Sequence, residues 1–290
     1  MTMMATLTSG LHQASPRIKV QHKPQTNVHK NFLAQAQRLG FDVGYVDMLL
    51  STDHAHTHID QLWSDFIENF LDITDFKAGF DAHHRHIAVA GDIASGKSTI
   101  LAQLACHILR KDKNEDVIFA LCENASGAVN ELLSCIARIL GAPVLYVRSA
   151  QELLYELDTL GDKRRFLIDL PSKPAEQLLY LEHFKNTQFR QSVGILCALA
   201  RRAELLATQE AMQLWLKYSH GWVLSFASEA APIGYALSMA CKSPRPLAYI
   251  AKSHDFLEGL SPASAPQLKS LIMSAITRLN QGQMQAALVS

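Results

Sequence analysis

The stretch that most constrains this chain is Gly91–Ser98, which reads GDIASGKS. It matches the phosphate-loop (P-loop) pattern GxxxxGK[ST] at every fixed position. Gly91 and Gly96 permit tight turns, so that several backbone N–H groups can point at one phosphate. In this pattern Lys97 places a cation on the outer phosphates, and the Ser98 hydroxyl holds Mg²⁺. The predicted nucleotide-phosphate cradle consists of Gly91, Ser95, Gly96, Lys97, Ser98 and Thr99.

The flanking residues supply the setting that this motif requires. The apolar run His86–Ala90 comes directly before the loop and is typical of a buried strand. Residues 99–110 follow it with apolar side chains at helical spacing. A helix that begins at the loop directs its positive end toward the same anion. A chance match in a Gly/Ser turn would lack this order of strand, loop and helix.

Strand-like and helix-like runs alternate from residue 86 onward, which predicts an α/β fold with a doubly wound, mainly parallel sheet. The candidate strands are His86–Ala90, Val117–Leu121, Val144–Val147, Phe166–Asp169, Gly194–Leu199, Trp222–Phe226 and Leu247–Ala251. Amphipathic stretches separate them, as expected for helices on both faces of the sheet. In such sheets ligands bind outside the carboxyl ends of the strands, where the P-loop also falls.

A second candidate site element is Phe166–Asp169, where three apolar residues end in a carboxylate. This is the shape of a Walker B strand, whose carboxylate reaches Mg²⁺ directly or through water. We therefore predict a metal site made by Ser98 and Asp169. The alternative is that Asp169 caps a helix, since Pro171 and Pro174 follow closely.

Composition excludes several classes of protein. The 290 residues carry a formal net charge of zero, so no overall attraction to nucleic acid is expected. The five cysteines are scattered, which suits reduced thiols in a cytoplasm better than a disulfide framework. No apolar run reaches the ~18 residues that span a bilayer. The start, MTMMATLTSG, lacks the pattern of a secretory signal.

The part before the P-loop is expected to contain two units. Residues 1–30 contain Lys and Arg but no Asp or Glu. This composition predicts a disordered basic arm. That arm is either a solvated tail or a contact for acidic lipid or an acidic partner. Residues 31–80 predict a small helical unit whose apolar stripe packs on the next domain. Histidines 54, 56 and 58 are interpreted as a solvated linker, with metal binding as the alternative.

Four segments, in this order, resemble the signal-recognition-particle (SRP) type GTPases, and within them the branch that places flagella. They are Arg38–Leu50, Gly127–Val144, Phe166–Ser172 and Glu229–Leu268. The resemblance implies a helical N domain at 31–80, a P-loop (G) domain at 81–280 and a tail at 281–290. It also implies GTP, with ATP not excluded, together with Mg²⁺ and a homodimer formed across the bound nucleotides. It further implies peripheral attachment, through acidic lipid or a membrane protein, to the inner face of a cytoplasmic membrane.

Three departures from that family concern the chemistry. The family's "DTYR" falls on Cys122–Ala125, so its Asp and Arg are missing, and losing such groups costs orders of magnitude in rate. The family's "TKLD", which selects guanine, falls on Ser225–Ser228 without a carboxylate. The Gly of "DTAG" falls on Ser172, after a proline that stiffens the loop. Glu123 or Glu229 is a candidate replacement carboxylate, and the catalytic residues stay unassigned apart from an Asp169 contact to metal or water.

Three functional hypotheses follow from these patterns. The first is an SRP-type GTPase with slow turnover that serves protein targeting or organelle placement. The second is a scaffold of the same fold that no longer hydrolyses nucleotide. The third is a P-loop ATPase or small-molecule kinase, for which Arg201 and Arg202 would supply a lid. Nucleotide titration separates the three.

Overall fold

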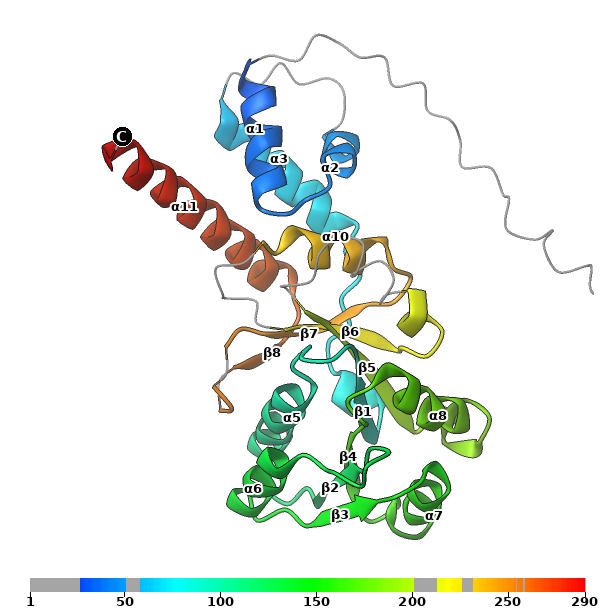
Figure 1. Cartoon of the computed structure of the whole chain (residues 1–290). Helices are drawn as coiled ribbons and strands as arrows, with labels where there is room; N and C mark the ends of the chain where they lie inside the picture. The colour runs from blue at the N-terminus through cyan, green and yellow to red at the C-terminus, as the bar shows by residue number, and fades with distance from the viewer. Residues whose placement is uncertain are drawn as a thin grey trace, which may run out of the picture.

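The computed structural model describes residues 27–50, 58–200, 213–225, 232–253, 255–257 and 259–289. Within these ranges an eight-stranded sheet carries helices on both faces, and a group of three helices lies at one end of the molecule (Figure 1). The predicted α/β fold with a mainly parallel sheet is confirmed. Residues 1–26 of the predicted basic arm and the first two linker histidines lie outside the described residues.

The sheet has the strand order β3-β2-β4-β1-β5-β6-β7-β8. All neighbouring strands are parallel except β7 and β8. The strands are β1 His86–Ala90, β2 Val117–Cys122, β3 Val144–Val147, β4 Arg165–Asp169, β5 Val193–Ala200, β6 Gly221–Ser225, β7 Leu247–Ala251 and β8 Leu260–Pro262. The seven predicted strands are present within one residue of their expected ends. The edge strand β8 was not predicted, because three residues ending in proline form no apolar run.

Helices cover both faces of this sheet. They are α1 Asn27–Arg38, α2 Val43–Leu49, α3 Ile59–Asp72, α4 Phe80–His83, α5 Lys97–Lys111, α6 Glu131–Ile139, α7 Ala150–Leu160, α8 Pro174–Lys185, the 3₁₀ helix η1 Gln188–Arg190, α10 Gly234–Lys242 and α11 Ala265–Val289. Alternate residues of β1 face two cores: Ile87 and Val89 face α5 and α6, whereas Ala88 and Ala90 face the other side. Across the described segments, no helix is both long and apolar enough to cross a membrane.

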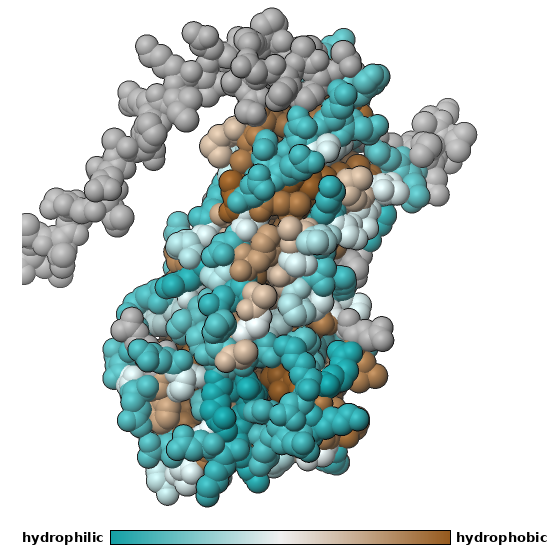
Figure 2. Space-filling view, turned by 180° about the vertical axis from the view of Figure 1, so that it is seen from behind, coloured by the Kyte–Doolittle hydropathy of each residue, from teal (hydrophilic) through white to brown (hydrophobic). Residues whose placement is uncertain are grey.

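The three N-terminal helices pack around an aromatic cluster. The predicted stripe of α3 is buried, and it places Trp63 and Phe66 against α1 and the turn that follows it. Phe32 and Trp63 meet edge to face with ring centroids 4.7 Å apart, and Phe41 and Phe66 do so at 5.1 Å. Figure 2 shows apolar side chains between the polar helices at the upper end of the molecule. Edge-to-face pairs of this kind stabilise by about 0.5–1.5 kcal/mol beyond their buried area.

The helical group is docked on α10 through direct backbone contact. Gly40 has a φ of 84° and ends α1, as a glycine in the left-handed conformation commonly ends a helix. The N–H of Gly234, the first residue of α10, donates to the Leu39 carbonyl at 2.8 Å. A Cβ at Gly234 would lie 2.4 Å from the Phe41 nitrogen, so only glycine permits this approach. The predicted packing of the helical unit on the following domain therefore rests on a main-chain contact.

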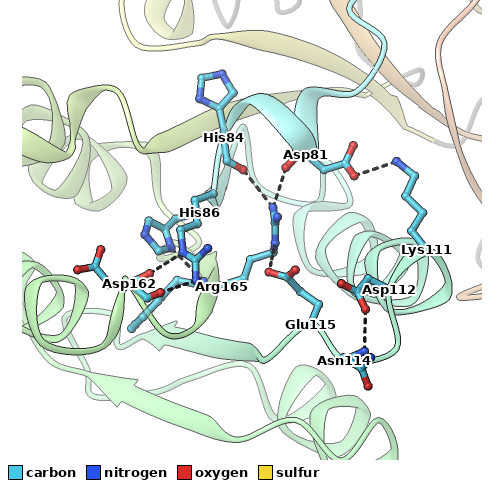
Figure 3. A network of polar contacts seen from close by, with 12 residues as sticks. Asp81, His84, His86, Lys111, Asp112, Asn114, Glu115, Asp162 and Arg165 are labelled. Atoms are coloured by element: carbon cyan, nitrogen blue, oxygen red, sulfur yellow. Dashed lines mark hydrogen bonds and ion pairs between the residues drawn. The ribbon is translucent and has the colours of Figure 1, made fainter.

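A polar network closes the amino-terminal edge of the sheet (Figure 3). Asp81 of α4 accepts from Tyr249 Oη at 2.7 Å and from Lys111 Nζ at 2.9 Å. Burial alone would raise the pKa of Asp81, but these two donors lower it below its ordinary value. Arg165 Nη1 donates to the carbonyls of Asp81 and His84, while its Nε donates to Glu115 at 2.9 Å. The network thus ties α4 to β4, α5 and β7 at the amino ends of the strands. The carboxyl ends of the strands are left for ligands.

Candidate nucleotide-binding site

The P-loop joins the central strand β1 to α5 and turns through three residues with positive φ. These φ angles are 146° at Gly91, 61° at Ala94 and 89° at Gly96. A Cβ at Gly91 would lie 2.8 Å from Ser95 Oγ and 3.1 Å from the Ala198 carbonyl oxygen. Ala94 holds a left-handed conformation that costs a non-glycine residue about 1–2 kcal/mol. Such strain persists only where the surrounding structure enforces it, which here produces a tight turn.

Lys97 is the first residue of α5, and only 7% of it is exposed. Its Nζ donates to the carbonyl oxygens of Gly91 at 3.1 Å and Asp92 at 2.8 Å. Burial lowers the pKa of Lys97, while the nearby carboxylates of Asp169 and Asp92 oppose that shift. The ammonium therefore lies in a poorly solvated position at the floor of the turn, where its attraction for an anion is screened little by water.

Ser98 and Asp169 come together as the sequence predicted. Ser98 Oγ donates to Asp169 Oδ1 at 3.4 Å, and Asn130 Nδ2 donates to Ser98 Oγ at 2.5 Å. Asp169 ends β4, the strand paired with β1, so the sheet register fixes its distance from the loop. Burial raises the pKa of Asp169 to about 7, although Lys97 opposes the shift. A hydroxyl beside a carboxylate provides the hard oxygen ligands that suit Mg²⁺.

These groups line a cavity of about 440 Å³. Its lining residues are Ala94, Ser95, Gly96, Lys97, Ser98, Thr99, Cys122, Asn124, Ala128, Val129, Asn130, Asp169, Leu170, Pro171 and Ser172. Every residue of the predicted cradle lines it except Gly91, which lies beneath it and supplies the carbonyl that Lys97 contacts. The volume falls within the range of small-molecule sites, roughly 300–1,000 Å³. The cavity opens at the carboxyl ends of β1, β2 and β4.

Gln177 of α8 is a site residue that sequence reasoning missed. It is fully buried, and its amide pairs with both backbone groups of Gly91. The Gly91 N–H donates to Gln177 Oε1 at 3.0 Å, and Gln177 Nε2 donates to the Gly91 carbonyl at 2.8 Å. The same Nε2 donates to the Ser172 carbonyl at 3.2 Å. Gln177 therefore holds the first glycine of the P-loop against the loop that follows Asp169.

Two further contacts also lay beyond sequence reasoning. Asn130 was recognisable as a helix cap, since it precedes an apolar helix, and its Oδ1 accepts from the Leu133 N–H at 3.2 Å. Its contact with Ser98 joins segments 32 residues apart and left no signal in the sequence. Buried Trp215 donates through Nε1 to Asp92 Oδ1 at 3.4 Å, which ties the P-loop to the segment before β6.

The segment where the family's "DTYR" was expected offers no new carboxylate to the cavity. Cys122 lines it, and burial raises the pKa of its thiol well above the ordinary value. Asn124 also lines it, but its Oδ1 accepts from the backbone N–H groups of Ser126 at 2.9 Å and Ala128 at 3.0 Å. Glu123 lies instead 3.9 Å from Arg148 Nε. Glu123 is therefore placed as a surface ion-pair partner in this arrangement.

The other segments of interest lie outside the described residues. These are 226–228, the greater part of the expected base-selecting segment, together with Glu229, Arg201 and Arg202. The lid and replacement-carboxylate hypotheses that use these residues stay predictions. Ser225 is described: it ends β6, and its Oγ donates to the Leu199 carbonyl at 3.3 Å.

Comparison with known proteins agrees with this geometry. The "Flagellar biosynthesis protein FlhF" of Pseudomonas aeruginosa is 25% identical over 195 residues. Those residues cover 65% of this chain and 44% of FlhF, so the chain spans less than half of that relative's length. This chain is similar to FlhF. The resemblance to SRP-type GTPases that the sequence suggested is confirmed, although no model of a known protein family matches the chain.

Solved structures agree on the fold. FlhF complexed with GMPPNP/Mg²⁺ superposes with a TM-score of 0.68 at 15% identity, covering 85% of this chain and 99% of that one. The cell division protein FtsY of Thermotoga maritima superposes with a TM-score of 0.65 at 17% identity, covering 84% and 85% of the two chains. The chain therefore has the fold of an SRP-type G domain preceded by helices.

Proposed function

We propose that this chain is an FlhF-like nucleotide-binding protein that takes GTP with Mg²⁺ and hydrolyses it slowly or not at all. The observation that carries the proposal is the convergence of Lys97, Ser98 and Asp169 on one polar cavity. Lys97 and the loop N–H groups would bind the phosphates, while Ser98 and Asp169 would hold the metal. The proposal of GTP draws on the FlhF structures, which are complexes with GTP/Mg²⁺ and GMPPNP/Mg²⁺.

The weak-hydrolysis part rests on what surrounds the cavity. Catalysis of phosphoryl transfer depends on charged groups that stabilise the transition state and orient water. Among the described lining residues, Lys97 and Asp169 are the charged ones, and their predicted roles are phosphate and metal binding. Pro171 stiffens the loop that would respond to the γ-phosphate. The expected outcome is binding without appreciable turnover.

The deciding experiment is titration of the whole chain with GTP and with ATP, each with Mg²⁺. The variants are Lys97→Ala and a matched control, Lys113→Ala, whose lysine lies on an exposed turn far from the cavity. We expect micromolar GTP binding that weakens about tenfold or more in Lys97→Ala, which corresponds to about 1.4 kcal/mol, and is unchanged in Lys113→Ala. Phosphate release, measured in parallel, distinguishes slow from lost hydrolysis.

Each alternative function has its own outcome in this titration. Preference for ATP, with turnover that depends on a small acceptor, would favour the kinase hypothesis. Absence of binding by either nucleotide at millimolar concentration would remove both enzymatic hypotheses and leave the scaffold. Replacing Asp169 by Asn should weaken the Mg²⁺ dependence of binding more than the binding of metal-free nucleotide, since its proposed partner is the metal.

We also propose the cellular role that the resemblance implies. The helices within 31–80 would act as an N-type domain, and residues 81–280 as the G-type domain of a protein-targeting or flagellum-placing factor. Two copies would associate across their bound nucleotides, and acidic lipid or a membrane protein would hold them at the inner face of the cytoplasmic membrane. Sedimentation with a non-hydrolysable GTP analogue tests the dimer. Flotation with anionic vesicles tests the membrane contact.

A further inference from the structure

A second cavity lies at the amino ends of the strands, opposite the nucleotide site at their carboxyl ends. Its volume is about 180 Å³, and it is bounded by the start of β5, the residues just before β6 and β7, and the end of α8. Figure 1 shows α8 beside the segment that leads into β6. The strands concerned are parallel, so their amino ends meet at one edge, whereas the P-loop lies at their carboxyl ends. The two cavities therefore share no lining residue.

The floor of this second cavity is apolar. It consists of Leu181 and Phe184 from α8 with Val193 and Ile195 from β5, each at most 4% exposed. An engineered dry cavity of about 150 Å³ admits one benzene ring, so a space of this size suits a single ring or a short branched aliphatic group. Burial of such a group on this floor would improve the free energy of binding by about 25 cal/mol for each Å² of apolar surface removed from water.

At the rim of the cavity, cationic side chains outnumber the neighbouring acidic ones. The cations Lys185, Lys217 and Arg245 line the cavity together with His220, whose Nδ1 accepts from the Ile195 N–H at 3.0 Å. Lys217 Nζ is paired with Glu182 Oε1 at 2.7 Å. Within the described part of the chain, neither Lys185 nor Arg245 has an ion-pair partner, and Lys185 Nζ lies 6.0 Å above the ring of Tyr218. Two partly buried positive charges thus remain at the mouth of an apolar space.

Arg245 has a hydrogen-bond donor that is left unpaired. Its Nε is buried and has no hydrogen-bond acceptor. A buried donor without a partner costs about 1–3 kcal/mol, and hydrogen bonds from a charged donor are among the stronger ones. An oxyanion inside the cavity is the acceptor that a guanidinium binds best, because it can accept two parallel N–H bonds. The apolar floor and the cationic rim therefore select for the same kind of ligand.

We propose that this cavity binds a small amphipathic anion, namely an aromatic or branched aliphatic group that carries a phosphate or carboxylate. The apolar part lies on Phe184 and Ile195, and the anionic oxygens face Arg245 and Lys185. The site is independent of the P-loop, so it stands whether or not the chain binds GTP. Since α8 carries Leu181 and Phe184 at this cavity and Gln177 at the P-loop, an occupant would also contact an element shared by both sites.

The test uses phenyl phosphate as the probe and the full-length chain carrying Lys97→Ala, so that the P-loop does not compete for the phosphate. Inorganic phosphate and phenol report the two halves of the probe separately. We expect phenyl phosphate to bind at least tenfold more tightly than either half, and to shift the backbone NMR signals of residues 181–185 and 193–195. Arg245→Gln should weaken this binding about tenfold or more, which is one charged hydrogen bond at about 1.4 kcal/mol per decade.

The matched control is Arg138→Gln, which removes an exposed arginine on α6 and should leave binding unchanged. If Arg245→Gln fails to fold, Lys185→Gln provides a second test, because Lys185 is half-exposed at the C-terminal end of α8. Equal affinity for phenyl phosphate and inorganic phosphate would overturn the proposal, as would unchanged binding in folded Arg245→Gln or Lys185→Gln. Signal shifts confined to other parts of the sheet would overturn it as well.

Discussion

The Gln177 amide provides the sharpest test of how the P-loop is held. In Gln177→Leu the side chain keeps its approximate size but loses all three hydrogen bonds to Gly91 and Ser172. The Gly91 carbonyl still accepts from Lys97, and Ser172 is exposed enough for water to replace the lost donor. The Gly91 N–H, however, is left buried without a partner. That single group sets the magnitude, which we place at about 1–3 kcal/mol of lost folding stability.

The assay is urea unfolding of the whole chain, followed by circular dichroism, with Gln37→Leu as the control. Gln37 is an exposed glutamine on α1, so its replacement should change the free energy of unfolding by less than about 0.5 kcal/mol. Gln177→Glu provides a second comparison, because it keeps an acceptor for Gly91 but turns a carboxylate oxygen toward two carbonyls. It should therefore be more damaging at pH 8 than at pH 4. A Gln177→Leu protein as stable as wild type would refute this account of the loop.

Three further outcomes follow from the structure. Burial raises the pKa of Asp169 to about 7 from 3.8, so in the metal-free protein the stability that this group contributes should be fully present below pH 4 and be lost as the pH rises through 7; pH-dependent unfolding curves of Asp169→Asn should lack this component. Tyr249→Phe removes a donor to the Asp81 carboxylate and should cost about 1.5–3 kcal/mol in denaturant titration, whereas a loss below 0.5 kcal/mol would contradict the network's importance. Gly234→Ala should loosen the helical group and speed amide hydrogen exchange in α1. In the control Gly44→Ala in α2 the new Cβ meets only Asp42 Oδ1, at an ordinary van der Waals distance of 3.5 Å, and the change should stabilise slightly, by about 0.5–1 kcal/mol; equal exchange rates in α1 would count against the docking contact.

The sequence was most informative where local pattern and tertiary role agree. The P-loop motif, the apolar strand before it and the carboxylate that ends Phe166–Asp169 all lie where their patterns predict. Parallel strands that are buried on both faces consist of consecutive apolar residues, so seven strands could be recognised in the sequence. Strand β8 carries only three residues and was missed, because its position depends on pairing with β7 rather than on its own composition.

The contacts that complete the site could not be predicted from one sequence. Gln177 lies 86 residues from Gly91, and Asn130 lies 32 residues from Ser98. Neither residue type is unusual for a helix or a helix cap, so nothing local marks them. Their roles arise only when the fold brings α8 and α6 beside the loop. The resemblance places base selection at Ser225–Ser228, and it stays a prediction because residues 226–228 lie outside the described part of the chain.

The resting state of Lys97 has a consequence for affinity. The Lys97 ammonium already donates to two main-chain oxygens. A phosphate that binds in this turn must therefore replace those hydrogen bonds with its own. Observed binding strength is then the difference between the new contacts and those given up. A single compact anion gains little from that exchange, whereas a polyphosphate tail, with several oxygens along the turn, gains much more. At the proposed nucleotide site, affinity is therefore expected to depend on the number of charges that a ligand carries.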